Sequence, residues 1–517
     1  MPERSSETIM TEARRVGECA GKRAFAEENR VCRRGASGLA LPSVSCGKRP
    51  CQEIAMRARR PLPFAVSVRL VRGLLSAVCG LALVVVAGQA WGQFGGGFGN
   101  QAVGGISIDA DGIVRNLEPR ALQSLAEERA KALAEGEGPA VAGKFRKVSL
   151  RALEAAAAES AAQGKPLAPG TRFLGGLERI THVFVDPDGH DIVLCGPADA
   201  IAVDAAGNVV GATSRRPLLQ LEDLVVALRG IDRARQGGMR CSIDPSPEGI
   251  ARLDAFLRRQ GTIGQDPQAT LRAMETAVGP QVVTVGGVPA SSRFARVLVA
   301  ADYRMKRIGM GLDESGLKEL PSYLALVPAG ARVSSLPRFW LEAEYDPIER
   351  DADELAWRIG GRRMKCLTES DLAGKDGIQR GAGAVDTFAQ KWCTVMTGQY
   401  AALEAKHPVF AELTNCVDLA VVAALIHGRQ LDKRAGLDLG VLLDEAKLPV
   451  PAYEAPETIP TVATGIKKGS NWVVSASGGV QFQPWEFAAT TKPSADIAAD
   501  RTQALAARAS VAGGWWD

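Results

Sequence analysis

One predicted helix carries the residue types that are candidates for catalysis. The segment 291–312, SSRFARVLVAADYRMKRIGMGL, repeats apolar residues at helical spacing and therefore predicts an amphipathic helix. Asp302 and Lys306 are four residues apart and can pair along this helix, and Tyr303 is their neighbour. If the helix faced a cleft, the three side chains would form a polar site. A solvated helix face with a few salt links is the commoner outcome, and we favour it.

A second group of carboxylates lies in the stretch DPDGHD, with Asp186, Asp188 and Asp191 around one glycine. A calcium loop needs further oxygen ligands and a late bidentate carboxylate, and the following residues IVLCGP supply none. The same pattern of β-rich run, Asp-x-x-Gly and β-rich run recurs in 105–115 and 200–212. The sequence therefore predicts three hairpin turns and no metal site. We expect positive φ at their glycines, which are Gly112, Gly189 and Gly207.

Other catalytic motifs are incomplete. Ser315 and Lys318 form an S-x-x-K, the acylation pair of penicillin-binding enzymes, but the S-x-N and K-T-G elements that accompany it are missing. The four histidines have no metal-binding spacing, and neither a P-loop nor a G-x-S-x-G occurs after residue 92. The sequence thus leaves open whether the protein is an enzyme, and it predicts no cofactor.

The cysteines after residue 92 form no C-x-x-C pair, which argues against a zinc ribbon or a thioredoxin-type site. One or two disulfides are compatible with an oxidising compartment, but the spacing does not indicate which cysteines pair. Burial as small apolar side chains is the alternative for each. These cysteines are Cys195, Cys241, Cys366, Cys393 and Cys416.

The N-terminal region has the pattern of an export signal. In 56–92, five arginines precede an apolar run, and small residues follow at Ala90 and Gly92, the spacing that signal peptidase reads. We predict a secreted or periplasmic protein; an inner-membrane anchor formed by 73–90 is the alternative. Residues 1–55 are predicted to be a disordered or misannotated extension, and 93–105 a glycine-rich linker.

The leader also changes the charge balance. Of the 62 basic and 58 acidic residues in the chain, 15 and 7 lie in residues 1–92. The remaining chain therefore has a net charge of −4 instead of +4. It has no stripe of Arg and Lys with interleaved aromatic residues, so we do not expect nucleic-acid binding. Membrane contact is expected only through an uncleaved leader.

The rest of the chain predicts an α+β protein of mixed α/β layers, with several β-hairpins and a C-terminal antiparallel helix pair. Helices and strands alternate in 106–335, which we predict to be one domain. In 336–490, antiparallel strands precede two helices that break at His407 and Pro408, and NWVVSASGGVQFQPW reads as a last hairpin. Residues 491–517 are predicted to be a tail with a short helix.

Several segments of the sequence resemble those of one family. These are FARVLVAADYRMKRIGMGL, CSIDPSPEGIARL, ELTNCVDLAVVAALI and GPADAIAVDAAGNVVGATSRRPLLQLEDLVVALR. They look like a large secreted family typical of planctomycete bacteria, catalogued only as a domain of unknown function, over Gly105 to Trp485. The resemblance implies no activity, substrate or catalytic residue. The residues before Met56 depart from the family pattern, which supports a start codon placed too far upstream.

Two functions remain. The first is a non-enzymatic envelope or extracellular protein that binds a macromolecule or has a structural role, because no catalytic groups are assembled in the sequence. The second is an envelope hydrolase with a polar site around Asp302 and Lys306. The surroundings of these two side chains in the fold distinguish the two hypotheses.

Overall fold

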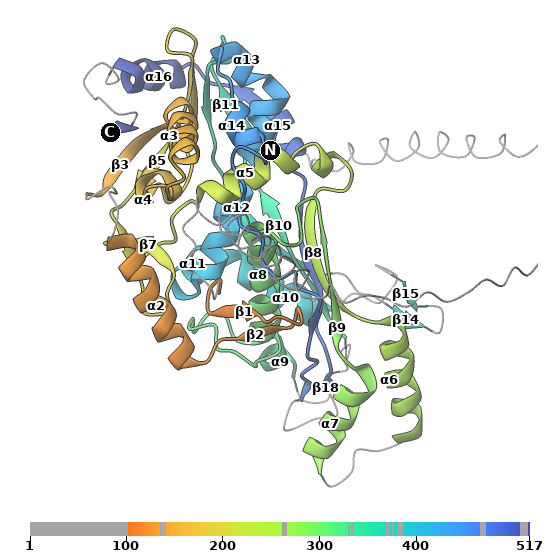
Figure 1. Cartoon of the computed structure of the whole chain (residues 1–517). Coiled ribbons are helices and arrows are strands. Elements are labelled where there is room, and N and C mark those ends of the chain that lie inside the picture. The colour runs from red at the N-terminus through yellow and green to blue at the C-terminus, as the bar shows by residue number, and fades with distance from the viewer. Residues whose placement is uncertain are drawn as a thin grey trace, which may run out of the picture. The chain divides into compact units, whose positions relative to one another are not determined.

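The computed structural model describes residues 102–134, 138, 141–260, 266–328, 331, 336–368, 372–374, 377–379, 386–465, 472–506 and 515–516 (Figure 1). All of them belong to the unit Leu74–Asp517. The predicted extension, the signal segment and most of the glycine-rich linker lie outside the described residues. The described part combines two large sheets with helices, which confirms the predicted α+β class.

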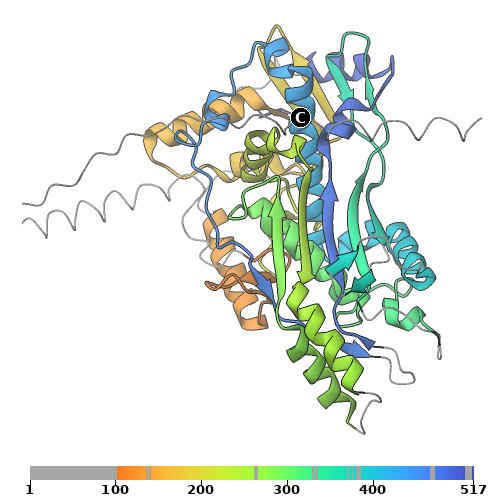
Figure 2. The same ribbon diagram turned by 90° about the vertical axis from the view of Figure 1, so that its right-hand side faces the viewer.

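A six-stranded sheet forms one layer of this unit (Figure 2). Its strands in spatial order are β13 (Arg363–Thr368), β10 (Arg338–Glu344), β19 (Ser477–Phe482), β8 (Met239–Pro245), β9 (Gln281–Gly286) and β16 (Thr458–Ile459). All neighbours are antiparallel except β10 and β19. Alternate residues of these strands point to opposite faces, so one face is apolar and the other is polar.

A seven-stranded sheet contains the predicted DPDGHD hairpin. Its strands in spatial order are β20 (Thr491–Pro493), β11 (Ile348–Arg350), β12 (Ala356–Arg358), β4 (His182–Asp186), β5 (Asp191–Ala198), β3 (Gly143–Ser149) and β21 (Trp515–Trp516). Four further hairpins are two-stranded: β1 (Ile106–Ile108) with β2 (Val114–Asn116), β6 (Ile201–Val203) with β7 (Val209–Gly211), β14 (Leu372–Gly374) with β15 (Gly377–Gln379), and β17 (Thr464–Gly465) with β18 (Trp472–Val473). The three predicted Asp-x-x-Gly hairpins are therefore all present.

Several helices begin at a side-chain cap. Ser149 accepts a hydrogen bond from the backbone N–H of Ala152 at the start of α3, and Asp266 accepts those of Gln268 and Ala269 at the start of α7. The longer helices are α2 (Pro119–Ala134), α3 (Leu150–Gln163), α5 (Leu221–Gly230), α6 (Pro247–Gln260), α7 (Pro267–Val278), α8 (Arg293–Gly309), α10 (Thr387–Gly398), α11 (Tyr400–Lys406), α12 (Pro408–Arg429), α15 (Pro484–Ala489) and α16 (Ile497–Ala506). The shorter ones are α4 (Pro169–Arg172), α9 (Tyr323–Leu326), α13 (Leu431–Ala435) and α14 (Gly440–Leu443).

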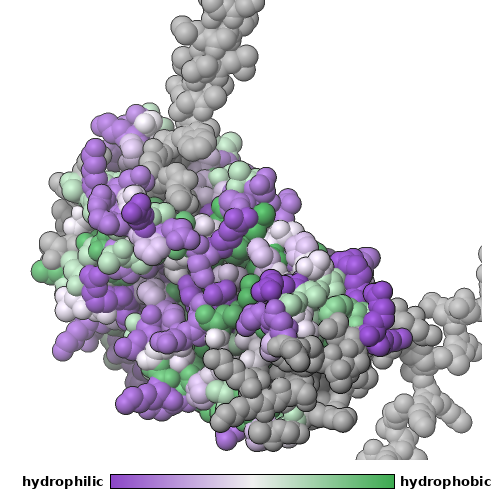
Figure 3. Space-filling model, turned by 90° about the horizontal axis from the view of Figure 1, so that it is seen from below, coloured by the Kyte–Doolittle hydropathy of each residue, from purple (hydrophilic) through white to green (hydrophobic). Residues whose placement is uncertain are grey.

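Helices α6 and α7 pack on each other beyond the ends of β8 and β9 (Figures 1 and 2). Seen from below, hydrophilic side chains cover much of the described surface, and the hydrophobic patches between them are small (Figure 3). The exposed large apolar side chains of the described residues are few and scattered, as in an ordinary water-facing surface.

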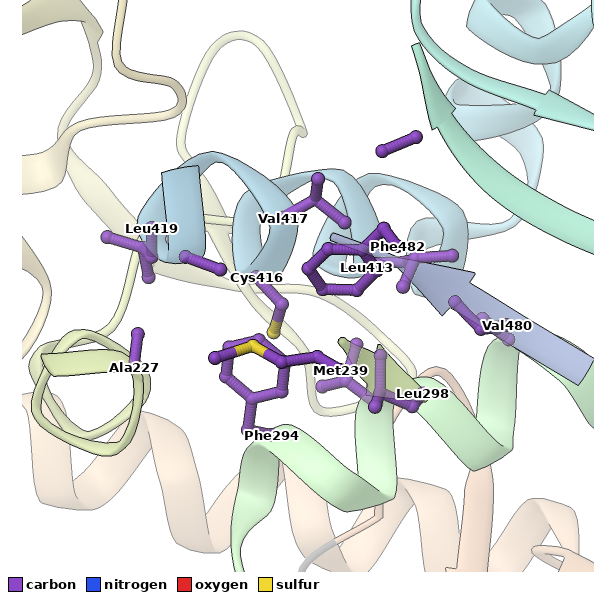
Figure 4. Packing of buried hydrophobic residues seen from close by; sticks show 14 of the residues in the cluster. Ala227, Met239, Phe294, Leu298, Leu413, Cys416, Val417, Leu419, Val480 and Phe482 are labelled. Carbon is purple, nitrogen blue, oxygen red and sulfur yellow. The ribbon is translucent and has the colours of Figure 1, made fainter. Parts of the chain in front are cut away.

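The centre of the unit lies between α8, α12, α5 and the inner face of the six-stranded sheet. Side chains from all four elements interdigitate there, including Phe294, Leu298, Leu413, Met239 and Val480 (Figure 4). Helix α12 has 22 residues and contains an 18-residue window with a mean hydropathy of 1.9, enough to cross a membrane, but this window is entirely buried within the unit. Its hydropathy is therefore explained by its place in the core.

The predicted division at residue 335 does not follow the sheets. Strands β8 and β9 precede it, β10, β13 and β19 follow it, and all five share one sheet. The predicted last hairpin is wrong, because β19 pairs with β8 and β10 instead of β18. Of the predicted helix pair, α11 packs on α12, while α10 packs mainly on β13.

Candidate functional site

Asp302 and Lys306 pair on α8, as their spacing predicts. Ser292 caps the helix by accepting the N–H of Ala295, and the Nζ of Lys306 lies 2.9 Å from Oδ2 of Asp302. Asp302 is completely buried and Lys306 is 5% exposed. The predicted solvated face is therefore wrong for these two residues. Helix α8 packs on β8, β19, α5 and α12, so Asp302 and Lys306 are covered, whereas Tyr303, Arg304 and Arg307 are half-buried.

The ammonium group of Lys306 uses all its hydrogen-bonding capacity inside the fold. Besides Asp302, it donates to the carbonyl of Ile243 in β8 at 2.8 Å and to that of Gly478 in β19 at 3.1 Å. An ammonium has three donors and no acceptor, so no donor is left for a substrate. Lys306 thus joins the helix to two neighbouring strands.

Asp302 lies in a charge-balanced environment. Asp244 and Arg338 act on it electrostatically, and these two are joined by an ion pair of 3.7 Å between Oδ1 and Nη1. Burial raises the pKa of the Asp302 carboxyl to about 7, against the lowering effect of Lys306. Its Oδ1 has no hydrogen-bond partner among the described residues. A perturbed acid of this kind also occurs in structural ion pairs, so it does not by itself indicate catalysis.

Tyr303 belongs to a different group of side chains. Its ring lies 5.5 Å from the guanidinium carbon of Arg307, which pairs with Asp313. Arg304 binds the same carboxylate. Burial acts to raise the pKa of Asp313, but the two arginines outweigh it and lower this pKa. Tyr303 therefore lies with Arg307 and Asp313, whereas Asp302 and Lys306 pair with each other.

The other sequence candidates have structural roles. Asp186 and Asp191 are opposite each other at the end of the β4–β5 hairpin, and Oδ1 of Asp186 accepts the N–H of Gly189 at 3.0 Å. The residue with positive φ is His190, at 51°, so the prediction for Gly189 is wrong, whereas Gly112 and Gly207 have it. Asp188 occupies the turn between the strands. Among the described residues, no group of three or more metal-binding side chains is found.

The S-x-x-K pair is not arranged for acylation. The Ser315 hydroxyl donates within its own turn, to the carbonyl of Leu320 at 2.6 Å, and accepts the N–H of Leu317. Lys318 is exposed in this turn and is not part of a helix. The Ser315 hydroxyl is thus engaged by backbone groups of its own turn instead of by Lys318.

A larger polar cluster was not predicted. Arg293, at the start of α8, binds the carboxylates of Asp223 in α5 and Glu412 in α12, and Glu222 lies 3.8 Å from its Nε. The Tyr453 hydroxyl donates to Glu222 at 2.7 Å. Burial raises the pKa of Asp223 to about 7, although Arg293 lowers it. The cluster lies where the first turns of α5 and α8 meet α12.

This acidic cluster carries no signal in the primary sequence. Glu222 and Asp223 look like ordinary acidic residues in a first helical turn, and Glu412 lies about 190 positions away in an apolar helix. Their convergence on Arg293 depends on how three helices cross. All four charged side chains are buried, so the cluster is a buried ion-pair network at the junction of α5, α8 and α12.

One shallow pocket of the described residues leaves no interior space for a molecule even the size of water. It is lined by Ile106, Ile108, Val114, Arg296, Val299 and Ala300. Small-molecule sites usually measure about 300–1,000 Å³ and combine an apolar wall with several converging polar groups. Asp302 and Lys306 do not line this pocket.

One comparison with known proteins matches. Residues 241–323 fit the model of a family described as "Protein of unknown function (DUF1598)". The matched segment starts in β8 and ends at the first residue of α9, so it contains α8 with Asp302 and Lys306. This confirms the resemblance to a domain of unknown function over that segment. No curated protein and no solved structure matches the chain.

Proposed function

We propose that this protein is a non-enzymatic binding or structural protein of the cell envelope, or is secreted. The observation that carries the proposal is the three-acceptor environment of Lys306, with acceptors from Asp302, Ile243 and Gly478 within 3.1 Å. A hydrolase needs an acid or base that reaches the substrate. Here the strongest candidates support the packing of a helix on a sheet.

The polar face of the six-stranded sheet is the surface that we assign to binding. Helices α8, α10 and α12 pack on the opposite face of the sheet and lie behind its strands in Figure 2. Strand pairing arranges outward-facing residues in two rows across the sheet. One row consists of Lys365, Glu342, Gln481 and Arg240, and the other of Leu367, Trp340, Gly479, Ser242 and Thr284.

The chemistry of these rows favours a neutral polysaccharide. Lys365 and Glu342 form an ion pair of 3.0 Å, and the hydroxyls of Ser242 and Thr284 lie 2.7 Å apart. Hydroxyl, amide and charged groups on a flat surface offer both donors and acceptors to sugar hydroxyls. The charges nearly cancel, which disfavours a strongly charged polymer, and large exposed apolar side chains are too few for a hydrophobic protein interface.

Cosedimentation of the purified full chain with insoluble neutral envelope polysaccharide tests this surface. We expect the substitution Thr284→Glu to lower the bound fraction at least about fivefold, because it places a charge within the hydroxyl row. Thr276→Glu is the matched control, since Thr276 is exposed on α7 away from the sheet. Absence of binding by the wild type, or equal binding by both variants, would contradict the proposal.

The compartment needs a separate test. Fractionation of cells and sequencing of the mature N-terminus should place the protein outside the cytoplasm with a terminus just after Ala90 or Gly92. Retention in the inner membrane with 73–90 intact would favour the anchored alternative. A cytoplasmic protein that begins at Met1 would overturn the proposed location.

A further inference from the structure

Two buried cysteines that are distant in sequence lie side by side. The Sγ atoms of Cys366 in β13 and Cys393 in α10 are 3.4 Å apart, and each residue is 3% exposed. Strand alternation points Met364 and Cys366 to the inner face of the sheet. Helical periodicity places Cys393 on the buried face of α10 that packs on β13. Both secondary structures thus direct these thiols to the same interface.

The backbones around the two thiols are joined by a second interaction. The hydroxyl of Thr397, one turn after Cys393, accepts the N–H of Cys366 at 2.9 Å and approaches its carbonyl at 3.3 Å. Trp392, the residue before Cys393, packs on Phe339 of β10, with their ring centroids 4.5 Å apart. The strand β13 and the helix α10 are therefore held in fixed positions relative to each other beside the two sulfurs.

The remaining cysteines of the described residues are not placed next to another cysteine in this way. Cys195, Cys241 and Cys416 are buried, and each lies in a different element. The sulfur–sulfur contact within the described residues involves none of these three, and burial raises the pKa of each thiol. They have the environment of small apolar core residues.

We propose that Cys366 and Cys393 are a disulfide-forming site, oxidised by thiol–disulfide exchange while the chain folds. Closing the bond requires the sulfurs to approach from 3.4 Å to about 2.05 Å, a movement that side-chain rotation can supply. This inference goes beyond the proposed binding function and does not depend on the sheet surface. It also identifies a cysteine pair that the sequence spacing left open.

The oxidant is a disulfide-bearing oxidoreductase or glutathione disulfide. One cysteine thiolate attacks the oxidant disulfide, forms a mixed disulfide and releases the first oxidant thiolate. The second cysteine thiolate attacks the mixed disulfide, forms the Sγ–Sγ bond and releases the second oxidant thiolate. The protein loses two electrons and two protons, and the oxidant gains them. Burial raises the pKa of Cys366, so the exchange occurs before the interface closes.

The test is disulfide mapping of the full chain refolded with oxidised and reduced glutathione. Free thiols are alkylated, and trypsin cleaves after Lys365 and Lys391, which separates the two cysteines into peptides 366–375 and 392–406. We expect one linked peptide pair, 2 Da lighter than the two thiol peptides together, and alkylated peptides for Cys195, Cys241 and Cys416. Separate alkylated peptides, or a link between other cysteines, would overturn the proposal.

Variants provide a second readout. Cys366→Ser should abolish the link, whereas Cys195→Ala should retain it. Reduction should lower the thermal midpoint of the wild type by roughly 3–5 °C and leave that of Cys366→Ser unchanged. If the variant does not fold, the mapping of the wild type still decides the question.

Protein isolated from its own cells separates this inference from the proposed location. A disulfide between Cys366 and Cys393 in this protein supports both the disulfide site and the envelope location. Free thiols in the cell together with a disulfide after refolding would leave the site in place and overturn the envelope location. Failure of the pair to link under both conditions would overturn the site alone.

Discussion

The ammonium nitrogen of Lys306 lies 2.9 Å from Oδ2 of Asp302, one turn earlier on α8, and both side chains are buried between the helix and the six-stranded sheet. Taking two charges out of water is costly, and an ion pair repays this cost only when its other hydrogen bonds are made. On the lysine side the condition is met through the carbonyls of Ile243 and Gly478, whereas Oδ1 of Asp302 has no hydrogen-bond partner among the described residues. The pair therefore connects helix and sheet.

Removal of the ammonium should destabilise the fold strongly. Lys306→Met leaves the Asp302 carboxylate and two buried carbonyls without their donor, and we expect a loss of about 3–5 kcal/mol in the free energy of unfolding. Guanidinium denaturation measures it. Lys391→Met, at an exposed position of α10, is the control and should change stability by less than about 0.5 kcal/mol. Equal effects of the two substitutions would contradict a structural role for Lys306.

The raised pKa of Asp302 predicts a pH effect of defined sign. The folded pKa of about 7 exceeds the value of 3.8 for an unperturbed aspartate, so the folded state holds the proton more tightly than the unfolded state. Protonation of Asp302 therefore stabilises the folded state, fully below about pH 4. This stabilisation is lost as the pH rises to about 7. The thermal midpoint of the wild type relative to Asp302→Asn should therefore fall between about pH 5 and about pH 7 and then level off.

Asp313 provides the control for this pH effect. Its pKa is lowered because Arg307 and Arg304 outweigh burial, so its contribution is lost only as the pH falls through the acid range. The midpoint difference between the wild type and Asp313→Asn should stay constant between about pH 5 and about pH 8. A flat profile for Asp302→Asn over the same range would show that the carboxyl of Asp302 is already ionised at pH 5.

Gly478 should resist substitution. Its φ of 111° lies in the left-handed region, and a Cβ atom would meet the carbonyl oxygen of Phe339 at 1.9 Å. Gly478→Ala should therefore cost about 2 kcal/mol or more and displace the carbonyl that Lys306 binds. Gly398→Ala is the control, because a Cβ there meets nothing within 4 Å; in a helix it should stabilise by about 0.5–1 kcal/mol. Urea denaturation of both variants measures the contrast.

The cluster around Arg293 should show strong coupling. Arg293→Met leaves the buried carboxylates of Asp223 and Glu412 without their cation and should cost about 3–5 kcal/mol. Asp223→Asn in the same chain removes one of these charges and should recover part of the loss. A double-mutant cycle should give a coupling energy of about 1–3 kcal/mol between the two residues. Additive effects would show that they do not act as one cluster.

Elements with strong local signals agreed with their sequence predictions. The break at His407 and Pro408 and the three Asp-x-x-Gly hairpins depend on interactions among neighbouring residues. The pairing of Asp302 with Lys306 is of the same kind, since four residues make about one helical turn. The family resemblance of the segment 241–323 was also evident in the sequence.

Predictions that required knowledge of the partner element were less accurate. The last strand, β19, was assigned to a local hairpin but lies between β8 and β10, because pairing with distant strands buries both sides of its backbone. The positive φ expected at Gly189 occurs at His190, which closes the same turn. Asp302 and Lys306, expected on a solvated face of α8, are buried, since the sheet packs on them.

Local chemistry in the chain thus specifies helices, turns and i to i+4 pairs, because those interactions form among residues that are already neighbours. The burial of Lys306, the convergence of Glu222, Asp223 and Glu412 on Arg293, and the approach of Cys366 to Cys393 arise only when distant segments pack together. Whether a polar side chain faces water or the core depends on which element covers it, and that element can lie a hundred or more residues away. For this protein, that difference separates a candidate catalytic pair from a structural one.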